Sequence, residues 1–144
     1  MESQSTARPR FALICAIVAV LFGLMTIISG GAILFAGGAM LEFAGDYVPF
    51  VLWFNFIAGF AYVVAGVGLY LWRGWAINLS LLIAFSTLIA FAGFGIHILN
   101  GGVYEPRTLG AMVLRSGVWI TIGWLTYKAR KKTIHKMTPD IIRK

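Results

Sequence analysis

One short stretch of the chain, HILNGGVYEPRTLGAMVLR at positions 97–115, holds three side chains that could do chemistry within a largely apolar sequence: His97, Glu105 and Arg115. A histidine in such a segment can act as a ligand or a proton relay, and an arginine there commonly marks a substrate or ion pathway. His97 and Glu105 could instead have purely structural roles. A histidine suits the last turn of a helix, and a glutamate before Pro106 suits the start of the next one.

Arg115 is the hardest of the three to explain as purely structural. It follows Arg107 by eight residues, which is about 12 Å along a helix at about 1.5 Å per residue. A cation at that depth in a membrane costs about 2.5–3.5 kcal/mol on insertion scales. The cost falls if the guanidinium reaches toward the outer surface or meets a carboxylate. The candidate acids on that side are Glu42, Asp46 and Glu105.

Asn55 adds an amide to this group. By the same rise per residue, Asn55 lies about 9–10 Å below Pro49, the outer boundary of its predicted helix. We therefore expect the polar side chains of the outer half to form a pocket that is open to the outside. The predicted pocket consists of Asn55, His97, Glu105 and Arg115, with Glu42 and Asp46 as a possible acidic rim.

Metal, haem and thiol chemistry find little support in the sequence. A metal site needs about three or four ligands, and no close spacing such as H-x-x-x-H is present around His97. His135 lies in the tail, so His97 alone could ligate haem within a span. Cys15 is the single cysteine and cannot form an internal disulfide or a C-x-x-C pair. We predict no metal site and no catalytic residue, and the sequence assigns no cofactor.

The composition places these residues in a membrane protein. Of 144 residues, 60% are hydrophobic and only 12% are charged, whereas soluble domains carry about 25% charged residues. Too few polar side chains remain to cover a water-facing surface, so lipid must be the solvent for most of the chain.

Charged side chains are absent from three long runs, which extend over 11–41, 47–72 and 74–104. Each exceeds the roughly 20 apolar residues that cross a hydrocarbon core, and a run of this kind satisfies its backbone as a helix. A fourth run is interrupted only by Arg115. The sequence therefore predicts an all-α, antiparallel four-helix membrane bundle that forms one domain over 1–144, with helices at about 11–36, 48–72, 75–99 and 108–127 and a basic tail at 128–144.

Two further expectations concern the ends of this domain. The first apolar run is about twice the length of a signal-peptide core, so we expect a retained helix. Pro139 is expected to prevent a long continuation of the fourth helix into the tail.

The positive charges are segregated to one side of the predicted spans. Ten of the twelve Lys and Arg residues fall there: Arg8, Arg10, Arg73, Lys128, Arg130, Lys131, Lys132, Lys136, Arg143 and Lys144. The positive-inside rule then places both termini in the cytoplasm. Because topology accounts for the net charge of +7, we expect no nucleic-acid partner.

Small and polar residues gather on one face of each predicted helix, as helices that associate in lipid require. These faces are Cys15, Ala19, Gly23, Thr26 and Gly30; Asn55, Gly59, Tyr62 and Gly66; Ser86, Ala90, Gly93 and His97; and Thr108, Ala111, Arg115, Trp119 and Thr126. Gly110 and Gly117 lie on the side of the fourth helix opposite Arg115. We expect that second face to contact another copy of the chain or a larger membrane complex.

Two segments resemble a known family. The segment GLMTIISGG (23–31) and the segment AGFAYVVAGVGLYLWRGWA (58–76) resemble the DoxX/MauE-like small four-helix bacterial membrane proteins. Those proteins often show a Ser-Gly late in the first helix and a Gly-rich second helix before a short inner turn. The resemblance implies an inner-membrane protein linked to redox or maturation complexes. Where such proteins often carry a glutamate on the second helix, this chain has Asn55.

Three classes of function remain. An accessory, scaffold or maturation subunit of a larger membrane complex, possibly a redox complex, best explains a small set of helices with modest polar content. A small carrier or permease for a proton, metal or anion would use the outward-facing pocket. A membrane enzyme that acts on a quinone or a lipid is the third, although the sequence favours a non-enzymatic role.

Overall fold

The computed structural model describes residues 9–142, with side chains described for residues 9–132. Every regular element in this part of the chain is a helix. Helix α1 (Arg10–Gly31) continues into a π-helical segment, η1 (Ala32–Ala36), and a short helix α2 (Ala39–Ala44) follows. The remaining elements are α3 (Pro49–Tyr70), α4 (Gly74–Leu99) and α5 (Pro106–Ile142).

Four of these helical segments are long and apolar enough to cross a membrane. The candidate spans are Arg10–Ala36, Pro49–Tyr70, Gly74–Leu99 and Pro106–Lys132. The prediction of an all-helical chain with four membrane-crossing helices is therefore confirmed by length and composition. The apolar side chains of these helices imply contact with a lipid bilayer.

The fourth long helix extends further than the sequence predicts. We expected it to end near 127 and Pro139 to prevent a long continuation, but α5 runs to Ile142. The segment KARKK at 128–132 explains the difference, because Lys, Ala and Arg are among the best helix formers and continue a helix already started. Pro139 falls in the last turn of α5, so nearly all of the helix precedes it.

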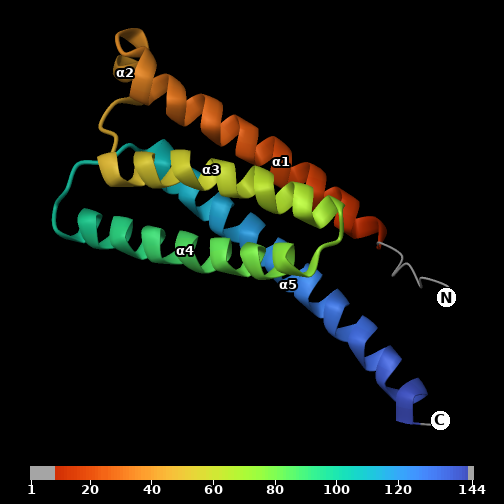
Figure 1. Ribbon diagram of the computed structural model, residues 1–144. Coiled ribbons are helices and arrows are strands. Elements are labelled where there is room, and N and C mark those ends of the chain that lie inside the picture. Colours follow the sequence, from red (N-terminus) through yellow and green to blue (C-terminus); the bar gives the residue numbers. More distant parts are fainter. Residues whose placement is uncertain (1–8, 143–144) are drawn as a thin grey trace.

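Successive long helices run in opposite directions (Figure 1). Helix α3 packs along α1 and also against α4, and α4 packs against α5. The turn between α3 and α4 is tight: Trp72 adopts a positive φ of 52°, and the Arg73 amide donates to the Gly68 carbonyl at 2.9 Å. The start of α1 and the end of α5 lie at one end of the molecule, the terminal end, and α2 lies at the other, the α2 end (Figure 1).

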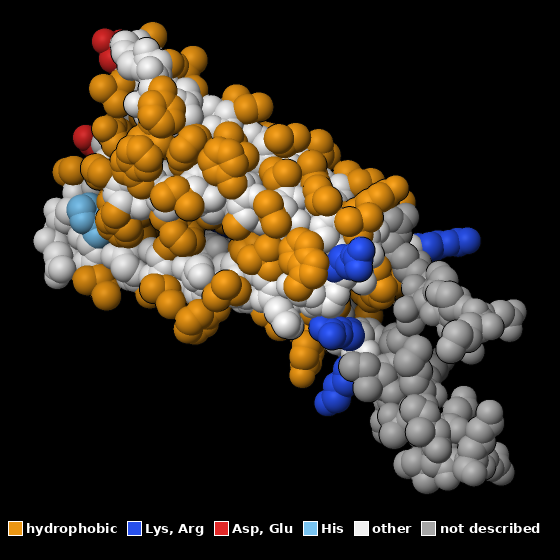
Figure 2. All heavy atoms as spheres, in the orientation of Figure 1, with side chains coloured by type: hydrophobic (Ala, Val, Ile, Leu, Met, Phe, Trp, Pro, Cys, Tyr) orange, Lys and Arg blue, Asp and Glu red, His pale blue; other side chains and the backbone are white. Residues whose placement is uncertain are grey.

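Charge is distributed along the same axis. Figure 2 shows Lys and Arg side chains near the terminal end and acidic side chains near the α2 end, with hydrophobic side chains over the surface between them. This pattern is that of a protein whose flanks face lipid and whose two ends face water.

Close contact between α1 and α3 depends on glycine. A Cβ atom added to Gly23 would lie 2.8 Å from the Gly59 carbonyl oxygen, and one added to Gly66 would lie 3.0 Å from the Ala16 carbonyl oxygen. The two backbones therefore approach to a distance that any side chain larger than hydrogen would prevent. This is the packing expected of helices in lipid, where small residues permit the contact.

The buried face of α4 differs from the predicted one. Ser86, Ala90, Gly93 and His97 are half-buried, whereas Thr87 and Phe94 are fully buried, each one position further along the chain. One position is a rotation of about 100° around a helix. The prediction followed small residues alone, but the buried face of α4 mixes small side chains, such as Ala76, Ser80 and Ala84, with the larger Ile77, Ile83 and Phe94.

We expect Gly23→Ala to lower stability and Gly95→Ala to leave it unchanged or slightly raise it. Both changes add one methyl group within a helix, so they share the same gain in helix propensity, at most about 1 kcal/mol. Only the methyl at position 23 collides with a facing backbone, which costs about 1–3 kcal/mol; at Gly95 a Cβ meets nothing within 4 Å in the described structure. Thermal unfolding in mild detergent measures the difference. Equal effects of the two variants would contradict the proposed close contact.

Candidate functional site

The guanidinium of Arg115 lies among three helices. Arg115 is only 6% exposed, although it belongs to a helix with a membrane-facing side. Its Nη1 donates to the Oδ1 of Asn55 on α3 and contacts the Sδ of Met112 at 3.6 Å. The guanidinium carbon also lies 5.8 Å from the centroid of the Phe22 ring on α1. The prediction that Asn55 and Arg115 lie close together is confirmed.

No carboxylate neutralises this cation within the part of the chain whose side chains are described. The one ion pair there joins Arg107 to Glu105, at 2.9 Å. The Nε of Arg115 is buried and has no hydrogen-bond partner among the same residues. An amide oxygen, a thioether, an aromatic face and the nearby side chain of Tyr62 are thus the groups that surround this positive charge. None of them is a carboxylate, and burying a charge without an opposite charge is costly.

A cavity of about 180 Å³ adjoins Arg115 and Asn55. Its walls come from the α2-end halves of α1, α3 and α5, and Ala44 of α2 contributes to the lining. The volume far exceeds the roughly 15 Å³ that one water needs but is below the 300 Å³ or more typical of pockets for drug-sized ligands. It therefore suits a small chemical group rather than a large, rigid molecule.

Two of the hydroxyl groups that line this cavity already donate to backbone carbonyls. Thr26 Oγ1 donates to the Phe22 carbonyl at 2.7 Å, and Ser29 Oγ donates to the Thr26 carbonyl at 3.3 Å. Both line the cavity. Arg115 is the one charged side chain among the residues that line the cavity.

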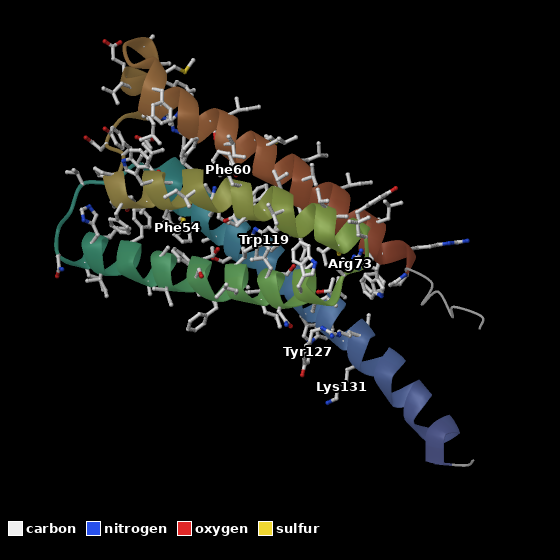
Figure 3. All side chains as sticks on the ribbon, in the orientation of Figure 1. Phe54, Phe60, Arg73, Trp119, Tyr127 and Lys131 are labelled. Atoms are coloured by element: carbon white, nitrogen blue, oxygen red, sulfur yellow. The ribbon has the colours of Figure 1, made fainter. Side chains whose placement is uncertain are left out.

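Three further polar side chains lie buried in the core near this site. The atoms Tyr62 Oη, Thr87 Oγ1 and Trp119 Nε1 have no hydrogen-bond partner in the described structure. The rings of Tyr62 and Trp119 are 4.7 Å apart, and Trp119 lies in the middle of the helices (Figure 3). Tyr62 also lies close to Thr87 and to Arg115. Sequence reasoning missed Thr87, because its side chain lies one position beyond the predicted face of α4.

His97 does not join Arg115. Its Nε2 is 3.0 Å from the Val103 carbonyl oxygen, within the loop that follows α4, and His97 is absent from the cavity lining. The rotation of α4 away from the predicted face explains this placement. The contact with Val103 supports the structural role that the sequence left open, as part of the turn at the end of the helix.

Glu105 connects the start of α5 to the region of α2. It accepts a hydrogen bond from Arg107, whose Nη2 donates to the Phe43 carbonyl at 2.9 Å. The Glu105 carboxylate also lies against Gly45. Glu105 thus helps to hold α2 above the cavity rather than lining it. Glu42 and Asp46, the predicted rim, are exposed at the α2 end.

No cluster of three or more His, Cys, Asp or Glu side chains that could hold a metal ion occurs among the described residues. Cys15 is a buried free thiol on α1. Tail residues such as His135, and the cations of 136–144, lie outside the described side chains.

Comparison of the chain with protein-family models, curated proteins and solved structures finds no match. The DoxX/MauE-like resemblance therefore stays a prediction, and the role of this site has to be inferred from its own geometry.

We expect Asn55→Asp to stabilise the protein. The change keeps the shape of the side chain and places a carboxylate beside the uncompensated guanidinium, and a hydrogen bond between charged groups contributes about 1.5–3 kcal/mol. Asn78→Asp is the matched control, because Asn78 is exposed near the terminal end of α4. Thermal unfolding of both variants in detergent provides the measurement. A lower unfolding temperature for Asn55→Asp than for the wild type would show that the charge of Arg115 is already balanced.

Proposed function

We propose that this membrane protein binds an anionic group, a carboxylate or a phosphate, in the cavity beside Arg115. The observation that carries the proposal is a buried guanidinium that meets no carboxylate among the described residues and borders a cavity. Buried charges in proteins are normally paired. A bound anion would supply the missing charge.

The chemistry of the guanidinium supports this choice of ligand. Its planar donors match the two oxygens of a carboxylate or a phosphate. Asn55 accepts a hydrogen bond from Nη1 through an uncharged amide oxygen. Asn55 therefore orients the guanidinium without neutralising it, as a residue that positions a binding group should.

Packing below the cavity favours binding over transport. Tyr62 and Trp119 are fully buried with their rings in contact, and Leu69 and Ile77 continue the same buried core toward the terminal end. An anion that enters from the α2 end meets closely packed apolar side chains beyond Arg115. The alternative of a carrier or permease would need these rings to separate during each cycle.

Thermal unfolding in a neutral detergent tests the proposal. Sodium acetate, phosphate or octanoate, compared with chloride at equal ionic strength, should raise the unfolding temperature of the wild type by about 2–4 °C at saturating concentration. Arg115→Gln should abolish the shift. Arg73→Gln, which removes an exposed cation at the terminal end, far from the cavity, should retain it. The proposal is overturned if no anion shifts the wild type, or if Arg115→Gln responds equally.

A second candidate is the accessory, scaffold or maturation subunit of a larger inner-membrane complex, possibly a redox complex. Gly110 and Gly117 favour it, because both are exposed and a Cβ atom on either would meet nothing within 4 Å in the described structure. A helix of a partner, or of a second copy, could approach closely there. Extraction in mild detergent followed by size measurement should then show a larger particle that both Gly110→Leu and Gly117→Leu disrupt. Unchanged particle size would remove this candidate.

We also propose that the four helices form an antiparallel bundle in the inner (plasma) membrane with both termini in the cytoplasm. The distribution of Lys and Arg supports this orientation. A fluorescent protein fused to the C-terminus should fluoresce, and alkaline phosphatase fused there should be inactive. An active phosphatase fusion would reverse the assignment.

A further inference from the structure

We infer that the anionic group belongs to a long-chain carboxylate, a fatty-acid-like amphipath whose hydrocarbon chain lies in a groove between α1 and α5. This inference rests on the proposed anion binding at Arg115 and names the ligand class of that site. One guanidinium balances one negative charge, and a carboxylate supplies that charge as a compact group suited to a cavity of about 180 Å³.

An apolar groove lies between the same two helices that flank the cavity. Its volume is about 440 Å³. Ile14, Cys15 and Val18 of α1 line one side, and Gly117, Val118 and Ile122 of α5 are among the residues of the other. The hydroxyl of Thr121, which also lines the groove, donates to the Gly117 carbonyl at 2.7 Å. The groove therefore offers hydrocarbon surface and no charged side chain among its described lining.

Cavity and groove follow one another along overlapping faces of α1 and α5. Thr26 lines the cavity and Cys15 lines the groove; eleven residues separate them, so they differ by only about 20° around the helix. On α5, Arg115 lines the cavity and Ile122 lines the groove. They are seven residues apart, so they also differ by only about 20° around the helix. Phe22, whose ring lies beside Arg115, falls on α1 between the residues that line the groove and those that line the cavity.

The length of the groove fits a hydrocarbon chain. Leu125 lines the far part of the groove. It follows Arg115 by ten residues, which is about 15 Å along α5. A carboxylate at Arg115 would send its chain in this direction, toward the terminal end. In a bilayer an apolar groove gains little by exchanging one acyl chain for another, so the charge at its end decides which chain is retained.

Helix packing explains why the groove exists. Helix α1 packs closely against α3, and α5 packs against α4, but α1 and α5 hardly contact each other. Gly117 lies beside this gap with no side chain to fill it. Gly110 shares the exposed side of α5 and lines neither the groove nor the cavity, which makes it a matched control.

Photolabelling of the purified protein tests the inference. A palmitate analogue with a diazirine near its methyl end should label residues of α1 near 14–18 and of α5 near 117–125, mapped by mass spectrometry. Free palmitate should compete, and its uncharged methyl ester should not. Gly117→Leu should reduce the labelling about tenfold, equivalent to about 1.4 kcal/mol, as should Arg115→Gln, whereas Gly110→Leu should leave it unchanged.

Three outcomes would overturn the inference. The first is labelling spread evenly over the exposed faces of α3 and α4, and the second is equal competition by the methyl ester. The third is equal loss of labelling in Gly110→Leu and Gly117→Leu, which would indicate a subunit contact instead. If any of these occurs while acetate still stabilises the wild type and not Arg115→Gln, anion binding survives and only the long-chain ligand is rejected. If acetate, phosphate and octanoate all fail, the proposed function itself is lost.

Discussion

The constraint that organises this structure is a buried positive charge. It lies among apolar helices, with no acid beside it in the described chain. Arg115 is buried, and its contacts include an amide oxygen on α3, a sulfur on its own helix and an aromatic ring on α1, with Tyr62 of α3 close by. Such dipolar contacts lower the cost of a buried cation but do not cancel its charge. The protein therefore keeps a site whose electrostatic balance is incomplete, and a cavity beside it large enough for a small anionic group.

The pairwise packing of the helices creates the space around that charge. Glycines at positions 23, 59 and 66 bring α1 and α3 together until their backbones nearly touch. Because α1 is committed to α3 and α5 to α4, a gap remains between α1 and α5, and it contains the cavity and the apolar groove. The pairing of α1 with α3 and of α5 with α4 thus explains both the close α1–α3 contact and the gap between α1 and α5.

Polar contacts at the α2 end and at the terminal end fix different elements of the structure. At the α2 end, the Glu105–Arg107 pair and its bond to the Phe43 carbonyl hold the short helix over the cavity. An exposed ion pair adds little stability, so its contribution is to position α2. At the terminal end, Arg130 donates to the Gly74 carbonyl at 3.1 Å and connects α5 to the α3–α4 turn. The described cations gather near the terminal end and the acids near the α2 end (Figure 2).

The sequence by itself determined the helical class, the four apolar helices and most of their boundaries, because lipid leaves an apolar run of that length few other ways to satisfy its backbone. It also predicted that Asn55 and Arg115 lie close together, since both fall at the same depth on faces rich in small residues. Only the tertiary structure decided that His97 is separate from them and that Thr87 lies in the core. A rotation of one residue around α4 moves a side chain by about 100°. That rotation depends on how bulky side chains from three helices fill one volume, which no pattern within a single helix records.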